Sequence, residues 1–410
     1  MSASVRTRFV ALAAAGAIAL LGGCSQSEEH HDEHGHHHEH EGHDHGGHGH
    51  VEGAEQLKEP ALSLVTASVA GEVHLVDLAS LESAEIAHLH SASALSGDDR
   101  YVAVQTEAGV ELVDSGVWTW EHGDHAHYYR AVPGVVAQAK GTGGAVASSN
   151  DLTVVRAGDA ALVLDKEELQ PGTPSTAGLA VPGVKFAALV EDTLITVEGG
   201  HLVTRELGDP LPAALPAAQN PVPCADFAGG AASRAGVVVA CGNVVHTATL
   251  DHQTEEVVFA SHTLLDVDAA APARFCGRAN HPHMAALSMD GSALWLVDMR
   301  EAKVTRVEIK APLASACALG DDANRIAAVD TTGAVRVFAG ADTSALQEAA
   351  VSEGVASADS AKLGVGVTAN RAYVVGADGK SVVEIDPADS ARVARTIPTE
   401  KLLGFAVVGQ

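Results

Sequence analysis

Histidines and one carboxylate crowd into a six-residue segment of this chain. The segment reads His-Gly-Asp-His-Ala-His, and its four candidate metal ligands are His122, Asp124, His125 and His127. Imidazole and carboxylate groups are common zinc ligands, and three imidazoles with one carboxylate complete a tetrahedral shell. His125 and His127 are two residues apart, so an extended backbone places them on one face. We therefore expect a compact zinc site here, with a solvated loop as the alternative.

A second concentration of histidine lies near the N-terminus. Eleven of the twenty-one residues from His30 to His50 are histidines, interleaved with acids. The segment has almost no apolar residues to bury, so we expect a disordered tail. Such a tail can fold several imidazoles around each ion, which predicts multiple exchangeable metal sites. The tail histidines that we assign as metal ligands are His36, His37, His38, His40, His43, His45, His48 and His50.

The residue types in the tail favour Zn²⁺ as the bound metal. Imidazole also binds nickel, cobalt and cupric copper. Copper-binding tails usually add thioether ligands, whereas none of the four methionines of this chain lies in the tail.

Two further His-x-His pairs are candidate ligands. His88 and His90 lie in HLHSASA, and His281 and His283 lie in NHPHMAAL. Each pair adjoins an expected inner strand, and loops that enter inner strands of a propeller gather at the mouth of its central channel. Chance surface histidines are the alternative. The scattered histidines that we interpret as structural are His74, His201, His246, His252 and His262.

The N-terminus carries an export signal. Arg6 and Arg8 precede an apolar stretch that ends in Leu-Gly-Gly before Cys24. The stretch is too short to span a bilayer, and the cysteine fits a lipobox, so we expect residues 1–23 to be a signal peptide. Acylation of Cys24 would anchor the protein on the outer face of the cell membrane or in the periplasm. An ordinary secretory signal with an incidental cysteine is the alternative.

The other four cysteines predict two disulfides in an oxidising compartment. Cys224 and Cys241 flank a compact strand-turn-strand region and suit each other, which leaves Cys276 with Cys317. The remaining connectivities stay open. The formal net charge of −28 repels phosphate backbones, so we expect no nucleic-acid partner.

A glycine-initiated repeat organises residues 59–410, after the tail of residues 24–58. Each copy is a glycine followed by a run of alternating apolar residues, as expected for a β-strand. The copies begin at Gly71, Gly109, Gly158, Gly199, Gly242, Gly291, Gly333 and Gly379. Their spacing averages about 44 residues, which is typical of propeller blades. We expect an all-β fold, a single eight-bladed β-propeller, or a seven-bladed one if a weak copy is only a long hairpin.

The last apolar run, Leu402 to Val408, lacks a blade of its own, and the first repeat lacks an inner strand. We expect the two to complete one blade together, which removes open sheet edges and closes the ring.

The segment HGDHAHYY, together with the propeller-like repeat and the histidine-rich lipoprotein tail, resembles the AztD-type periplasmic zinc metallochaperones. The resemblance implies a β-propeller that binds zinc and passes it to the solute-binding protein of a zinc ABC importer. It places His122, Asp124, His125 and His127 in or beside the zinc site. The chain departs from the family after Cys224, where CADFAGG replaces a histidine-containing stretch, so the resemblance carries over no ligand there.

Two other functions compete with a metallochaperone that catalyses no reaction. Propellers also host metal and redox enzymes. The sequence has no Gly-x-Ser-x-Gly elbow, phosphate loop or His-Glu-x-x-His motif, which disfavours those enzyme classes. The second competing function is an interaction scaffold with an incidental zinc-buffering tail. If the protein is such a scaffold, we expect no ordered zinc in the body. Four aromatics near the histidine segment are expected either to support it or to pack a blade: Trp118, Trp120, Tyr128 and Tyr129.

Overall fold

The described residues, from Val51 onward, belong to one compact unit that is built from β-strands. The computed structural model describes residues 51–122, 125–264, 270–356 and 364–410. Two short 3₁₀ helices, η1 (Lys166–Glu168) and η2 (Thr343–Ala345), lie among the strands. Within these described ranges no helix is long and apolar enough to cross a lipid bilayer.

The described residues form eight antiparallel sheets of four strands each, which follow one another along the chain. Written from the innermost strand outward, the first four blades are as follows. Blade one is β35 (Leu402–Val408), β2 (Ser63–Ser68), β3 (Glu72–Asp77) and β4 (Ser83–His88); blade two is β5 (Ala94–Gly97), β6 (Tyr101–Gln105), β7 (Val110–Asp114) and β10 (Gly134–Ala139); blade three is β11 (Gly144–Ser148), β12 (Leu152–Ala157), β13 (Ala160–Asp165) and β14 (Leu179–Pro182); blade four is β15 (Val184–Val190), β16 (Thr193–Glu198), β17 (His201–Glu206) and β18 (Gln219–Pro223).

The remaining four blades repeat the same order. Blade five is β19 (Phe227–Ser233), β20 (Gly236–Cys241), β21 (Val244–Asp251) and β22 (Glu256–Thr263); blade six is β23 (Pro272–Cys276), β24 (His283–Ser288), β25 (Leu294–Asp298) and β26 (Lys303–Val307); blade seven is β27 (Leu313–Ala318), β28 (Ile326–Asp330), β29 (Val335–Ala339) and β30 (Gln347–Ser352); blade eight is β31 (Val365–Val367), β32 (Ala372–Val375), β33 (Ser381–Asp386) and β34 (Arg392–Pro398).

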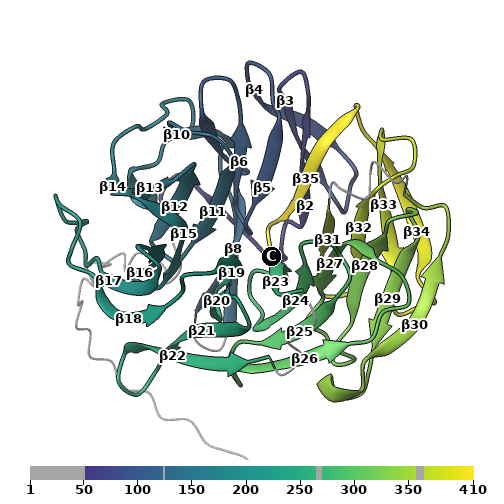
Figure 1. Ribbon diagram of the computed structural model, residues 1–410. Helices are drawn as coiled ribbons and strands as arrows, with labels where there is room; N and C mark the ends of the chain where they lie inside the picture. Colours follow the sequence, from purple (N-terminus) through teal and green to yellow (C-terminus); the bar gives the residue numbers. More distant parts are fainter. Residues whose placement is uncertain (1–50, 123–124, 265–269, 357–363) are drawn as a thin grey trace, which may run out of the picture. The chain divides into compact units, whose positions relative to one another are not determined.

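The eight sheets surround a central cavity of about 570 Å³. The innermost strand of every blade contributes residues to its lining, and successive innermost strands contact one another all the way round (Figure 1). This arrangement is a β-propeller, as the repeat predicted. Strands such as β6 and β20 are buried along their whole length because neighbouring blades pack face to face. The apolar clusters accordingly span adjacent blades, for example blades six and seven.

The glycine-initiated repeats are the third strands of the eight blades: β3, β7, β13, β17, β21, β25, β29 and β33. Gly71 and Gly109 show why glycine opens them. Both have positive φ, and a Cβ at either position would collide with a backbone carbonyl oxygen, that of Leu89 or that of Ala139.

The C-terminal strand closes the ring, which confirms the prediction. β35 pairs antiparallel with β2 from Ser63↔Val408 to Ser68↔Leu402, so the first and last parts of the body share blade one. Phe405 and Val407 on β35 pack with Tyr373 and Val375 of blade eight in one apolar cluster. The ring is therefore held by both hydrogen bonds and apolar burial.

Two disulfides connect the four body cysteines. Cys224–Cys241 joins the turn after β18 to the end of β20, and Cys276–Cys317 joins β23 of blade six to β27 of blade seven. These are the favoured pairings of the sequence analysis.

β1 (Glu55–Leu57), a strand outside the eight blades, falls within the segment 24–58 that the sequence assigned to the tail. It is ordered because it pairs with a strand of the body, which the composition of the tail does not reveal.

Candidate functional site

A β-hairpin outside the four-stranded pattern carries the histidine segment. β8 (Val117–His122) and β9 (His125–Arg130) leave blade two between β7 and β10 and pair with each other. Together with β1 they form a separate three-stranded sheet in the order β1-β9-β8.

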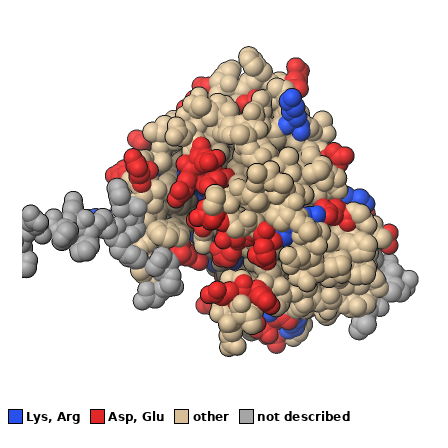
Figure 2. Space-filling view, turned by 90° about the vertical axis from the view of Figure 1, so that its left-hand side faces the viewer, with Lys and Arg blue, Asp and Glu red and all other residues tan. Residues whose placement is uncertain are grey.

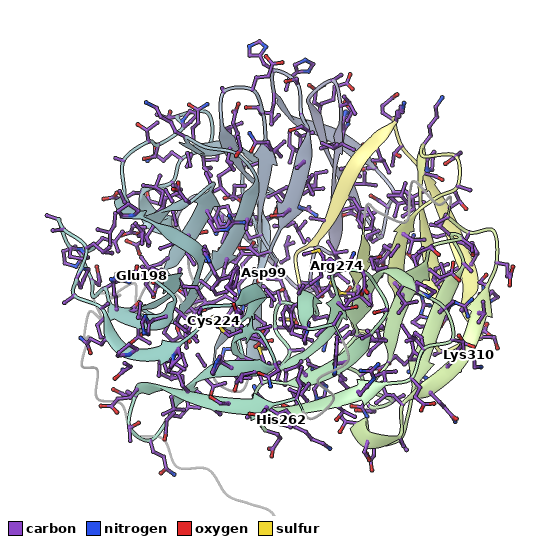
Figure 3. The ribbon with its side chains drawn as sticks, viewed as in Figure 1. Asp99, Glu198, Cys224, His262, Arg274 and Lys310 are labelled. Carbon is purple, nitrogen blue, oxygen red and sulfur yellow. A yellow bond between two sulfur atoms is a disulfide. The ribbon has the colours of Figure 1, made fainter. Side chains whose placement is uncertain are left out.

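The hairpin is fixed to one mouth of the central cavity. Thr119 Oγ1 donates to the carbonyl oxygen of Gly409, just after β35, at 3.2 Å. Asn280 Nδ2, from the loop between β23 and β24, donates to Glu121 Oε1 at 3.0 Å. Both contacts lie beyond the ends of inner strands. The Gly409 amide also donates to the carbonyl oxygen of Asp99. Asp99 lies near the centre of the ring in Figure 3. The hairpin thus extends from blade two to contacts with blades one and six.

Aromatic and imidazole rings line one face of the hairpin. The strand register opposes Trp118 with Tyr129 and Trp120 with His127. The ring centroids of Trp118 and Tyr129 are 5.0 Å apart, those of Trp120 and His127 are 5.7 Å apart, and those of His127 and His125 are 4.8 Å apart. These rings form a continuous row that packs the imidazoles in place, as expected for a supporting wall. Tyr128 opposes Thr119 and so belongs to the other face.

His125 and His127 bring together two imidazole nitrogens of the kind that ligate metals. Their Nε2 atoms are 3.0 Å apart in a hydrogen bond between the rings. At Zn–N distances of about 2.0–2.1 Å, two nitrogens of a tetrahedral zinc lie about 3.3 Å apart, so small movements of the rings allow both to ligate one ion. His127 is only 7% exposed, whereas His125 is exposed, so the pair has one fixed and one accessible ligand.

The other two members of the predicted ligand set are only partly visible. The backbone of His122 pairs with that of His125, but its side chain lies outside the described residues, as does Asp124. Among the side chains that the structure describes, no group of three or more His, Cys, Asp or Glu residues is arranged to hold a metal ion. The described part of the site therefore supplies two imidazoles.

Gln56, which the sequence did not single out, contacts the histidine pair. Its Nε2 lies 2.8 Å from Nδ1 of His127. Nothing in the composition of the segment 24–58 pointed to this contact, because the contact arises only when β1 pairs with β9.

His281 and His283 lie on the same side of the propeller as the hairpin. Their ring centroids are 5.0 Å apart, and His283 Nε2 is 3.2 Å from Asp298 Oδ2 across the β24–β25 pair. Burial, followed by the charges of Arg278 and of His283, lowers the pKa of His281 to about 4. The pair adjoins the hairpin through Asn280, the residue that contacts Glu121.

His88 and His90 lie at the opposite end of the blades. His88 ends β4, the outermost strand of blade one, opposite Glu72 at the start of β3, whereas the hairpin contacts the chain beyond the other end of this sheet, at Gly409. The His88 side chain is 64% exposed and contacts Glu85. The two His-x-His pairs therefore do not converge on one mouth, because one follows an outer strand and the other an inner strand.

The N-terminal candidates Cys24 and the tail histidines, residues 1–50, lie outside the described residues. Of the scattered histidines, His246 is buried and its Nδ1 hydrogen-bonds to the Ser261 hydroxyl at 2.8 Å, and burial lowers its pKa. This contact is consistent with a structural role for His246.

Acidic side chains outnumber basic ones on the side of the body shown in Figure 2. Burial and the neighbouring carboxylates of Asp192 and Asp151 raise the pKa of Glu191, and Asp192 is affected in the same way by burial and by Asp151. Glu191 lines a surface pocket together with Glu121 of the hairpin. Carboxylates thus lie beside the hairpin that carries the histidine segment, and carboxylates attract cations.

The body resembles solved propeller structures. It superposes on AztD from Citrobacter koseri with a TM-score of 0.66 at 13% sequence identity, covering 86% of this chain and 99% of that protein. The structure of apo AztD from the same organism gives a TM-score of 0.65 at 11% identity, with the same coverage of both chains. No protein-family model matches the sequence, and no curated protein matches it. The likenesses show that the chain has an AztD-type propeller fold.

Proposed function

We propose that this protein is an extracytoplasmic zinc metallochaperone, in which zinc is cargo and no reaction is catalysed. The observation that carries the proposal is the 3.0 Å separation of the Nε2 atoms of His125 and His127 on an anchored hairpin. His122 and Asp124 complete the ligand set, and neutral imidazoles exchange zinc readily enough for both loading and release.

In this proposal the two histidine-rich parts of the chain have different tasks. The tail, His30 to His50, collects zinc in exchangeable sites and loads the hairpin. The hairpin passes the ion to the solute-binding protein of a zinc ABC importer. Support for this direction of transfer comes from the AztD-type fold and from the metallochaperone family that the histidine segment resembles.

The proposal places the protein outside the cytoplasm, where disulfides persist. The Cys224–Cys241 and Cys276–Cys317 bridges fit that compartment, and acylated Cys24 would hold the chain at the membrane.

Zinc stoichiometry by native mass spectrometry tests the hairpin site. The experiment uses the mature protein with all eleven tail histidines replaced by serine, a change that leaves β1 intact. We expect one zinc ion per chain and its loss in the variant His125→Ala/His127→Ala. The variant His88→Ala/His90→Ala is the matched control, since it removes a His-x-His pair at the far end of blade one and should keep the ion.

Failure to bind zinc in the tail-substituted chain would contradict the chaperone site, as would retention of zinc after substitution of His125 and His127. Transfer is then measured by mixing the zinc-loaded chain with the purified solute-binding protein of the importer and following zinc on each partner.

A further inference from the structure

Strand β1 brings the tail side of the chain into the proposed zinc site. It pairs with β9 in the register Glu55↔Arg130, Gln56↔Tyr129 and Leu57↔Tyr128. Because side chains alternate along a strand, Gln56 shares the face of Tyr129 and the row of rings, whereas Glu55 and Leu57 belong to the opposite face. Of the three residues of β1, Gln56 is thus the one beside His127.

The Gln56 side chain is within hydrogen-bond distance of the His127 nitrogen that faces away from His125. The amide Nε2 of Gln56 is 2.8 Å from Nδ1 of His127, while Nε2 of His127 faces Nε2 of His125. A primary amide offers a donor at one end and an acceptor at the other, and rotation by 180° exchanges the two. Gln56 can therefore accept a hydrogen bond from a protonated Nδ1 without any movement of the backbone.

That hydrogen bond decides which nitrogen of His127 can bind a metal. A metal-ligating histidine usually donates its other ring N–H to an oxygen, which fixes the tautomer and the orientation of the ring. With Nδ1–H donating to the amide oxygen of Gln56, the lone pair of His127 lies on Nε2 and points to His125. The interaction favours the tautomer that ligates through the nitrogen nearer to His125.

We infer that Gln56 is the positioning residue of the zinc site, acting through His127. The inference rests on the proposed function. It gives β1 a role beyond packing, namely to orient His127. β1 also begins five residues after His50, the last histidine of the tail. The strand that orients the buried ligand is thus continuous in sequence with the segment proposed to collect zinc.

The test measures zinc affinity by chelator competition in the full mature chain with its tail histidines replaced by serine. Gln56→Ala should weaken zinc binding about 10- to 100-fold, the usual cost of losing an outer-shell partner. Gln56→Glu should restore binding to within about threefold of the parent chain, because a carboxylate accepts from Nδ1–H as the amide oxygen does. Glu55→Ala is the matched control, on the same strand and also exposed, and should leave affinity unchanged.

Nitrogen NMR of His127 in the zinc-loaded chain shows which ring nitrogen is protonated and which binds the metal. A role of Gln56 in strand packing alone would not change that assignment. We expect Nδ1 protonated and Nε2 metal-bound in the parent chain and in Gln56→Glu. Unchanged affinity in Gln56→Ala would overturn the inference, as would equal losses in Gln56→Ala and Glu55→Ala, which would show that β1 acts only by pairing. If the parent chain binds no zinc that depends on His125 and His127, the proposed function fails and the inference fails with it.

Discussion

The guanidinium Nη2 of Arg234 lies 2.6 Å from the carbonyl oxygen of Thr119, so the turn between β19 and β20 of blade five is hydrogen-bonded to the middle of β8. The same guanidinium pairs with the carboxylate of Asp99, which is 7% exposed. Arg234 therefore connects three parts of the chain that are far apart in sequence: blade two, the hairpin and blade five.

Substitution of Arg234 by alanine should loosen the hairpin and destabilise the body. The change leaves the buried carboxylate of Asp99 without its charged partner, which we expect to lower the free energy of unfolding by on the order of 3 kcal/mol. Zinc affinity should fall as well, because β8 loses one of its three hydrogen bonds to the rest of the body described above. Denaturant unfolding and chelator competition measure the two effects. Arg392→Ala is the control, since the Arg392–Asp389 pair is exposed on both sides, and it should change little.

Zinc binding by the hairpin should decrease as the pH falls from 7.5 to 5. Protons and zinc compete for the same imidazole lone pairs, so acid displaces the metal. Native mass spectrometry at the two pH values, with far-ultraviolet circular dichroism to confirm that the propeller stays folded, gives the measurement. Equal zinc occupancy at both values would rule out ligation by histidine.

The inter-blade disulfide should contribute more stability than the other one. Cys276–Cys317 closes a separation of 41 residues, and Cys224–Cys241 closes one of 17. By loop-closure entropy, replacing both cysteines by serine should cost about 4 kcal/mol for the first pair and about 3 kcal/mol for the second. Urea midpoints of the two double variants test the order. A larger loss from the shorter loop would show that local packing outweighs chain entropy here.

Ionisation of the Asp98 carboxyl should lower the free energy of unfolding as the pH rises from about 4 to about 6. Burial, together with the charge of Asp99, raises the pKa of Asp98 from its ordinary value of 3.8 to about 6. Between these values the folded chain binds more protons than the unfolded chain, so stability falls with rising pH.

Asp98→Asn should flatten this part of the pH profile by on the order of 1 kcal/mol. The asparagine keeps an oxygen to accept from the amides of Arg100 and Tyr101 and offers an N–H to the Ser148 hydroxyl. The free energy of unfolding is measured at pH 4.5 and pH 7 for both chains. If the free energy of unfolding changes between pH 4.5 and pH 7 by the same amount in both chains, Asp98 is not the source of that change.

The repeated parts of the fold were predictable because they obey a period. A glycine opens each third strand, and the apolar run Leu402 to Val408 was one inner strand too many for a linear array, which predicted its pairing in blade one. The shared face of His125 and His127 also followed from strand alternation. Each of these features depends on residues close in sequence or on a count of repeats.

The rest of the candidate site depends on contacts that no period encodes. Gln56 reaches His127 across 71 positions, and its strand is ordered only because β9 offers an edge. The pairs at His88 and His281 have the same His-x-His spacing, yet they lie at opposite ends of their blades. The end of the blade at which a pair lies depends on which strand of the blade it follows, and the spacing of the histidines does not reveal that strand.

The C-terminus lies at the centre of the ring, where Gln410 lines the cavity and Gly409 accepts from Thr119 beneath the hairpin (Figure 1). An affinity tag fused after Gln410 would therefore begin inside the mouth of the channel and emerge beside the hairpin. A polyhistidine tag there would compete for the very ion under study and crowd the hairpin. Purification handles belong in an exposed turn at a blade's outer edge, such as the one between β21 and β22, where the chain leaves room on the solvent side.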